Sequence, residues 1–201
     1  IKVKDIPFQA ITFKVGLEII HMKDISSTAS FVDFTLENFI YVDKTGYIPK
    51  LVKLKRVFIS RPRRFGKSLT LDTIATLFET GVEPYFKGTW IYDKWTEPTY
   101  PVLRLNFLNF DKNSLEKFNN KLNSKITEFA ELNHVTSYKE KEEAEDSIDH
   151  LLEQLRLENR QIVILIDEYD CQMTANINNT ELYDSFREVM RSFYEIGRAH
   201  V

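Results

Sequence analysis

The sequence predicts an α/β fold: a mostly parallel central sheet with flanking helices. Residues 56–60 form a short apolar segment that leads through a basic loop into a helical pattern. Residues 162–166 form an uninterrupted run of apolar, mostly β-branched residues. Such a run is typical of a parallel strand that is buried on both faces. The chain has 201 residues, which is enough for one such domain with a substantial core.

The first part of the chain gives the weakest signal. Residues 6–20 mix β-branched and aromatic residues without a clean period, so residues 1–34 are compatible with one or two strands and equally with a loose arm. The pattern becomes clearer further on. Apolar residues recur at helical spacing from Ile48 to Leu54, and the predicted strand 56–60 follows.

The loop after residue 60 carries the motif on which the functional prediction depends. Residues 61–68 read Arg-Pro-Arg-Arg-Phe-Gly-Lys-Ser. A strand, a tight loop ending in Gly-Lys-Ser and a helix occur in this order in the phosphate-binding loop of P-loop NTPases. Gly66 lets the backbone approach a phosphate closely, Lys67 is expected to reach the β- and γ-phosphates, and the Ser68 hydroxyl is expected to bind Mg²⁺. The unpaired amides and the dipole of a helix start also favour an anion there.

One part of the full pattern is missing, because Arg61 stands where the motif G-x-x-x-x-G-K-[ST] has its first glycine. The alternative interpretation is therefore an ordinary strand–turn–helix unit with a basic turn. If the loop binds a nucleotide, the residues expected to contact it are Arg61, Arg63, Arg64, Phe65, Gly66, Lys67, Ser68 and Leu69.

The second half of the site is predicted at the end of the strand 162–166, where Asp167 and Glu168 follow. Open α/β sheets place their ligands at the carboxyl ends of strands. Asp167 is therefore a candidate for the Mg²⁺ side of the site, and Glu168 is a candidate general base for the attacking water. A solvated strand end would explain this pair alone, but the two motifs together and in this order favour nucleotide binding.

Further helices and one more strand are predicted around these motifs. A helix over residues 67–79 should end at Gly81, and an amphipathic helix with Ser114 as N-cap should run to about residue 132. Two more helices are expected near residues 148–155 and 181–195.

A strand at residues 101–107 alternates apolar side chains with Arg104 and Asn106. These two are either site groups or hydrogen-bond partners of a neighbouring segment. The aromatic segment 84–100 is either a base-stacking platform or, in the interpretation we prefer, a loop packed over the core.

Charge is distributed unevenly along the chain. The net charge of −3 argues against a nucleic-acid coat protein. Residues 44–67 nevertheless hold nine Lys and Arg and no acid, which a bound nucleotide explains, whereas residues 128–158 hold ten acids and three bases, typical of the solvated face of helices. The single cysteine, Cys171, cannot form an internal disulfide, so we expect a reducing, cytoplasmic setting. No apolar run approaches the roughly 20 residues that span a bilayer.

Four stretches match a known family in order and spacing: Tyr-Val-Asp-Lys-Thr at 41–45, the loop at 61–68, Pro-Val-Leu at 101–103 and Ile-Leu-Ile-Asp-Glu-Tyr-Asp at 164–170. Over about residues 35–195 the chain resembles the bacterial AAA-ATPase-like proteins. The resemblance implies ATP with Mg²⁺ as the bound nucleotide, makes the missing glycine a family trait, and implies that Asp43-Lys44-Thr45 lies near the nucleotide. Many members carry a PD-(D/E)XK nuclease-like domain after the ATPase domain, and this sequence contains none.

The resemblance also implies that the domain is truncated at its C-terminus, because a sensor residue, an arginine finger and a helical lid are expected further along. Arg187 and Arg191 lie on the last predicted helix, where surface ion pairs explain them better than a finger role. Residues 196–201 interrupt the helical pattern, and a common sequencing adapter could encode them. We interpret these six residues as a non-native tail.

The leading hypothesis is thus an ATP·Mg²⁺-binding P-loop domain, a fragment of a larger ATPase that hydrolyses ATP. The alternatives are a module that responds to nucleotide without turnover, and a non-catalytic module that binds nucleic acid or protein. The expected partner is the nucleotide. A homo-oligomer and a nucleic acid bound through a missing C-terminal domain stay open, and no membrane is expected.

Overall fold

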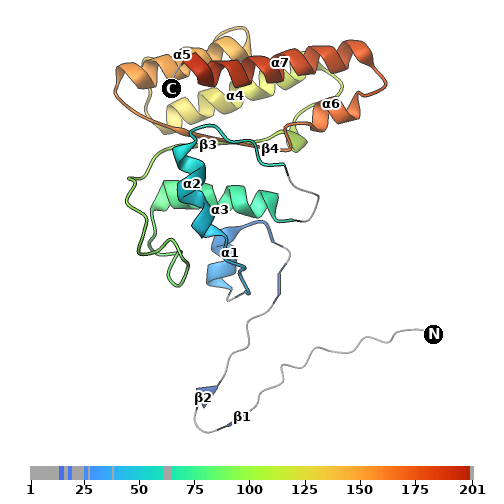
Figure 1. Cartoon of the computed structure of the whole chain (residues 1–201). Coiled ribbons are helices and arrows are strands. Elements are labelled where there is room, and N and C mark those ends of the chain that lie inside the picture. Colours follow the sequence, from blue (N-terminus) through green and yellow to red (C-terminus); the bar gives the residue numbers. More distant parts are fainter. Residues whose placement is uncertain are drawn as a thin grey trace, which may run out of the picture.

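The computed structural model describes residues 14–15, 18–19, 25–26, 28–37, 39–60 and 65–199. Its centre is a two-stranded parallel sheet formed by β3 (Val102–Asn106) and β4 (Val163–Asp167), with helices on both faces (Figure 1). Val102 lies opposite Val163 at one end of the ladder, and Asn106 lies opposite Asp167 at the other. The predicted α/β class, with a small parallel sheet and flanking helices, is therefore confirmed.

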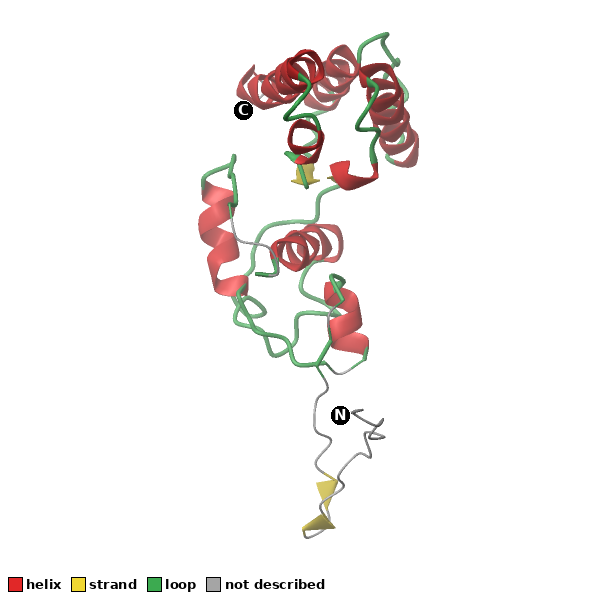
Figure 2. Ribbon diagram, turned by 90° about the vertical axis from the view of Figure 1, so that its right-hand side faces the viewer, coloured by secondary structure: helices red, strands yellow, loops and turns green. Residues whose placement is uncertain are grey.

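One face of the sheet is covered by α3 (Lys67–Thr80), which packs in turn against α1 (Phe31–Leu36) and α2 (Ile48–Lys53). Figure 2 shows these helices below the sheet, separated from the larger helical layer above it. A short 3₁₀ turn, η1 (Thr45–Tyr47), leads into α2. The core on this side consists of buried apolar residues from all of these segments and from the loop after α3: Phe31, Ile48, Ile74, Leu77, Phe78, Phe86 and Ile91.

The other face is covered by three long helices, α4 (Leu115–Leu132), α5 (Ala144–Leu157) and α7 (Thr180–Ala199). Two short elements follow the strands, η2 (Phe107–Asn109) after β3 and α6 (Cys171–Ala175) after β4. The core here is rich in aromatic rings, with Phe118 packed against Phe107, Phe110 and Phe186. In the part of the chain that the structure describes, no helix is both long enough and apolar enough to cross a membrane.

The pleat of the two strands decides which residues reach which face. Successive side chains of a strand point to opposite faces. Leu103, Leu105, Ile164 and Ile166 accordingly enter the core under α4, α5 and α7, while Val102, Val163 and Leu165 pack on the α3 side. Asp167 has the same parity as Val163 and Leu165, so the last residue of β4 is directed to the face that α3 covers.

The polar residues of β3 form hydrogen bonds and ion pairs that stabilise the fold. Arg104 pairs with Asp72, 2.6 Å from Nη1 to Oδ1, and with Glu79, both on α3. Asn106 Oδ1 accepts a hydrogen bond from the Leu108 amide at 3.0 Å and so begins η2. For Arg104, hydrogen bonding to a neighbouring segment is confirmed, whereas the observed hydrogen bond of Asn106 is local.

The long helices match the predictions closely. Ser114 is the N-cap of α4 and accepts a hydrogen bond from the Lys117 amide at 3.3 Å. Segment 84–100 is a packed loop, in which Phe86 and Ile91 are fully buried. The expected break of the last helix at residue 196 is wrong, because α7 continues to Ala199. The interpretation of residues 196–201 as a non-native tail stays a prediction.

The predicted strand at residues 56–60 is not present, because residues 57–60 have no regular secondary structure. A strand requires a neighbour that accepts and donates its ladder hydrogen bonds, and in the described residues β4 pairs only with β3. The segment instead contacts the residues just after β4 through Phe58. Its ring packs edge-on against the Tyr169 ring, with 4.8 Å between the ring centroids. Because no strand pairs with the free edge of β4 in the described residues, every residue of β4 is only half-buried. The prediction that this strand is fully buried on both faces is therefore wrong.

Little of the first part of the chain lies within the described residues. β1 (Lys14–Val15) and β2 (Glu18–Ile19) form a minimal antiparallel pair, one of the alternatives left open for residues 1–34. The helix α1 was not predicted. It begins at Ser30, whose hydroxyl accepts a hydrogen bond from the Asp33 amide at 3.2 Å, and the Phe31 amide donates to Asp72 Oδ2 on α3 at 2.7 Å.

Candidate functional site

The helix α3 begins with an open N-terminus at Gly66. The Gly66 backbone is in the left-handed region, at φ 71° and ψ 31°, which only glycine adopts without strain. Among the described residues no side chain caps the helix, and its first turn contains no acidic residue. Most helix starts satisfy their free amides with a capping oxygen or an acidic side chain. The start of α3 therefore has the uncapped amides and the dipole of an anion-binding helix terminus.

The end of β4 meets the start of α3. Asp167 Oδ2 accepts a hydrogen bond from the Ser68 hydroxyl at 2.6 Å, and Asp167 Oδ1 lies 3.2 Å from Lys67 Nζ. The side chain of Asp167 is 12% exposed and that of Lys67 is 25% exposed. The two motifs that the sequence placed about 100 residues apart are thus in direct contact.

Glu168 completes a group of four side chains. Its Oε1 lies 3.2 Å from Lys67 Nζ, and its amide donates to Asp167 Oδ1 at 2.9 Å. The Glu168 backbone has a positive φ of 53°, which is uncommon for a residue with a Cβ. Such conformations cost free energy, persist only where the surrounding structure imposes them, and concentrate at functional sites. Here the conformation turns the carboxylate back toward Lys67.

The carboxylates keep the Lys67 ammonium charged. Partial burial acts to lower its pKa, but hydrogen bonds to Asp167 and Glu168 and the attraction of both charges outweigh burial, so the pKa lies above its ordinary value. Lys67 is a protonated cation across the physiological range.

The remaining predicted site residues have different positions. Phe65 is 62% exposed beside the helix start, while the Leu69 side chain packs into the core on the α3 side. Arg61, Arg63 and Arg64 lie outside the described residues. Arg187 and Arg191 form ion pairs with Asp184 and Glu195 on α7 itself, as expected for surface residues.

Within the segment at residues 43–45, Lys44 lies beside Gly66, while the nearness of this segment to a nucleotide stays a prediction. A Cβ placed on Gly66 would stand 3.7 Å from Lys44 Nζ. Analysis of the residues alone missed Lys44, because no motif or periodicity marks it. The only signal for it in the sequence was the match of Tyr-Val-Asp-Lys-Thr to the family pattern.

The group of Lys67, Ser68, Asp167 and Glu168 is chemically suited to Mg²⁺ with a phosphate chain. Mg²⁺ prefers hard oxygen ligands and is usually bound by one or two protein oxygens together with substrate phosphates. The Ser68 hydroxyl and the Asp167 carboxylate are such a pair, already 2.6 Å apart. In the described residues no cluster of three or more His, Cys, Asp or Glu forms a metal site of its own, so a metal here would depend on the phosphates for the rest of its ligands.

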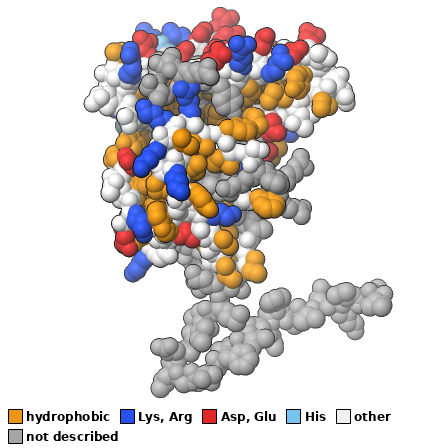
Figure 3. Space-filling model, in the orientation of Figure 1, with side chains coloured by type: hydrophobic (Ala, Val, Ile, Leu, Met, Phe, Trp, Pro, Cys, Tyr) orange, Lys and Arg blue, Asp and Glu red, His pale blue; other side chains and the backbone are white. Residues whose placement is uncertain are grey.

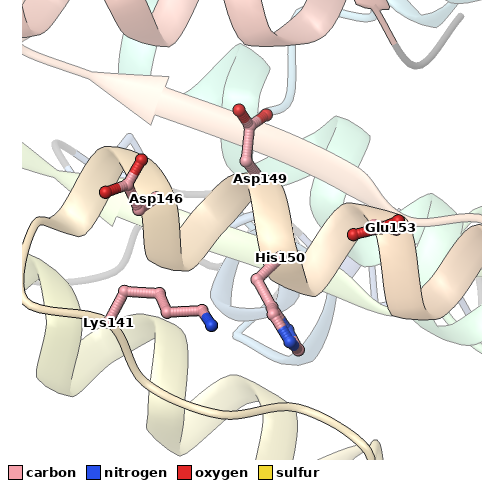
Figure 4. A pocket seen from close by; sticks show the side chains of 5 residues that line it. All are labelled: Lys141, Asp146, Asp149, His150 and Glu153. Carbon is pink, nitrogen blue, oxygen red and sulfur yellow. The ribbon is translucent and has the colours of Figure 1, made fainter.

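A separate hollow lies beside α5. It is lined by Lys141, Asp146, Asp149, His150 and Glu153 (Figure 4). Lys141 and His150 point toward the same space, whereas Asp146 and Asp149 point away from His150. The His150 ring packs edge-on against the Tyr138 ring, with 5.9 Å between the ring centroids. Because these charged groups do not converge, the hollow is not a catalytic constellation.

The fold and the contacts define an α/β domain in which an uncapped helix start and the acidic end of a parallel strand share one site. The chain belongs to the family described as predicted AAA-ATPase, whose family model matches residues 26–200. It is 34% identical over 176 residues to the "Uncharacterized protein in vnfD 5'region" of Azotobacter chroococcum mcd 1. That match covers 82% of this chain and 33% of the relative, so the chain spans about a third of the relative's length. No solved structure matches the chain.

Proposed function

We propose that this chain is the P-loop domain of a larger ATPase, and that it binds ATP with Mg²⁺ and hydrolyses it. The observation that carries the proposal is the convergence of Lys67 and Ser68, at the uncapped start of α3, with Asp167 and Glu168 at the carboxyl end of β4. These residue types, in these positions, are the parts that phosphoryl transfer needs.

In this proposal the phosphate chain lies over the start of α3. The Gly66 backbone allows close approach, because the Lys44 ammonium is the only atom of the described structure within 4 Å of where its Cβ would stand. Lys67 exchanges its contacts with Asp167 and Glu168 for the β- and γ-phosphates. The free energy of its two ion pairs is therefore a cost of binding, offset by phosphate contacts of the same kind.

Mg²⁺ would be held by Ser68 and Asp167, where it would neutralise charge on the β- and γ-phosphates. Glu168, released from Lys67, accepts a proton from the attacking water. The water oxygen bonds to the γ-phosphorus while the bond to the β–γ bridging oxygen breaks, so that ADP and phosphate leave. The strained backbone of Glu168 supports this role, since such conformations concentrate at functional sites.

A second candidate is a module that binds ATP without turnover. It is favoured by one observation: Arg187 and Arg191 are paired within α7, so neither of these two arginines is directed to the site. We also propose a cytoplasmic location, assembly into a homo-oligomer, and nucleic-acid binding by a further domain.

Calorimetric titration of ATP into the purified chain, with and without Mg²⁺, tests the proposal. We expect saturable binding that Mg²⁺ strengthens, together with phosphate release in a coupled assay. Binding without release in the same preparation would favour the non-hydrolysing module. Absence of binding by a chain that unfolds cooperatively on heating would refute the nucleotide site, and salt-sensitive DNA binding independent of nucleotide would favour an interaction module.

A further inference from the structure

The Lys44 ammonium lies beside Gly66 and forms no ion pair with any described residue. If Gly66 had a side chain, its Cβ would lie 3.7 Å from Lys44 Nζ. Lys67, by contrast, is paired with two carboxylates. In the described residues no carboxylate lies within ion-pair distance of Lys44, and the undescribed loop residues 61–64 contain no acid.

The backbone on both sides of Lys44 is fixed by Asp43. One carboxylate oxygen, Oδ1, accepts hydrogen bonds from the Thr45 amide at 2.8 Å and from the Thr45 hydroxyl at 2.7 Å. The other, Oδ2, accepts from the Trp90 amide at 2.6 Å. Asp43 is therefore engaged in holding the turn to the loop after α3, so its charge is directed to that loop and not to Lys44.

The next two residues are also used by the fold. Thr45 is fully buried, and its hydroxyl accepts a hydrogen bond from the Ile91 amide at 3.2 Å. A Cβ on Gly46 would meet the Trp90 ring at 3.4 Å, so the indole packs directly on this glycine. Three of the four residues 43–46 thus anchor the turn, and the fourth, Lys44, presents a cation to Gly66.

The charges already at this helix start do not pair with Lys44. A cation near the N-terminus of a helix meets the positive end of the helix dipole, and the first turn of α3 has no acidic residue of its own. The two carboxylates that reach the helix start, Asp167 and Glu168, are both paired with Lys67. An anionic ligand bound at the helix start would therefore give Lys44 a partner of opposite charge.

We propose that Lys44 is a second phosphate-binding lysine of the nucleotide site. The inference rests on the function proposed above and adds a residue to it. Lys67 must give up two carboxylates to reach a phosphate, whereas Lys44 has none to give up. Lys44 therefore contributes mainly to the affinity for the phosphate chain, and it acts alike on ATP and on inorganic tripolyphosphate.

The test compares Lys44→Ala with Lys53→Ala, which removes the same charge from an exposed position of α2. Affinities for ATP·Mg²⁺ and for tripolyphosphate are measured by calorimetry at several salt concentrations. A charged hydrogen bond lost from the site should weaken both ligands by about tenfold to a hundredfold in Lys44→Ala. The salt dependence of binding should become shallower in that variant, Lys44→Arg should recover part of the affinity, and Lys53→Ala should bind like the wild type.

The melting temperature without ligand separates this role from a structural one. Because the ammonium has no carboxylate partner in the described structure, Lys44→Ala should melt at or above the wild-type temperature, unlike Asp43→Ala. A loss of thermal stability equal to that of Asp43→Ala would overturn the inference, as would equal affinities for Lys44→Ala and the wild type. A wild-type chain that binds neither ligand would instead remove the proposed function itself.

Discussion

The two faces of the β3–β4 sheet are built from the same strands and differ in almost everything else. On the side of α4, α5 and α7, the strands contribute only leucine and isoleucine to a dry, aromatic core. On the α3 side the same strands contribute Arg104 and Asp167 beside their apolar residues, and both side chains bind groups of α3. The side of α4, α5 and α7, which we call the helical side, therefore receives only apolar side chains from the strands. The α3 side also receives charged side chains, which are costly to bury unless they are paired.

The surface differs in part between the two layers. In the view of Figure 3, acidic side chains lie mostly along the upper edge, together with several lysine or arginine side chains, while basic and hydrophobic side chains are mixed below it. Val57, Phe58 and Phe65 are among the exposed apolar residues in the segments before the start of α3. A surface with basic and apolar character next to an open helix start is suited to a nucleotide.

Removing the central lysine of the α3 side should have the largest effect. Lys67→Ala deletes the cation shared by Asp167 and Glu168, and we expect ATP affinity to fall by about a hundredfold or more, to no detectable binding. The matched control is Lys125→Ala on the helical side, which breaks the surface pair with Glu128 at 2.6 Å. That variant should bind ATP normally, and unchanged affinity of Lys67→Ala in the same calorimeter would refute the site.

Glu168→Gln should separate binding from turnover. The amide cannot accept a proton, so ATP hydrolysis should fall by about 10²- to 10⁴-fold. Affinity should be kept or slightly increased, because Lys67 loses one of the two carboxylates that compete with phosphate. Phosphate release and calorimetry on the same protein give both quantities. Glu128→Gln is the control on the other face, and a Glu168→Gln enzyme that still turned over at the wild-type rate would exclude Glu168 as the base.

The reverse experiment removes packing from the helical side. Phe118 is fully buried among three other phenylalanines, so Phe118→Ala should lower the free energy of unfolding by about 3–5 kcal/mol. Urea denaturation measures the loss. The ATP affinity of the molecules that stay folded should be unchanged, because this ring packs in the core on the opposite side of the sheet from α3. A tenfold change in affinity would show that the two faces are coupled more tightly than their contacts indicate.

The sequence predicted the elements that meet at the start of α3 and the end of β4 better than it predicted the sheet. The Gly-Lys-Ser loop, the helix after it and the acidic end of β4 are local patterns, and each requires only a few neighbouring residues. The parity of the strand even explains why Asp167 faces α3. The prediction of a strand at residues 56–60 was wrong because strand pairing depends on a partner elsewhere in the chain. The apolar periodicity of the segment carries no information about that partner.

Other features depended on contacts between distant residues. The helix α1 has only six residues and is anchored by Asp72 of α3, so its own sequence carries little signal. The positive φ of Glu168 is imposed by its surroundings, and the residue type does not predict it, because glutamate rarely adopts such a conformation. Lys44 is identical in type to the other lysines of its basic stretch, and only the fixed turn around it distinguishes it.

The smallest predicted effect concerns this turn and the response to acid. Partial burial acts to raise the pKa of Asp43, but hydrogen bonds from the Thr45 hydroxyl and from the Trp90 and Thr45 amides outweigh it, so the pKa lies below its ordinary value. A carboxyl group whose pKa is lowered on folding contributes stability above its unfolded pKa of about 3.9, and the contribution is lost as the pH falls through the folded value. Asp43 is well exposed, so we expect Asp43→Asn to cost only about 1 kcal/mol or less at pH 7.

Urea denaturation from pH 7 to pH 3 would measure this loss. The stability difference between the wild type and Asp43→Asn should shrink as the pH falls below about 4. The loss in Phe118→Ala should stay constant over the same range, because neither state of that side chain binds a proton. Parallel curves for the wild type and Asp43→Asn would mean that the hydrogen bonds of Asp43 do not stabilise the charged form, and the α3 side would then depend on apolar packing as much as the helical side does.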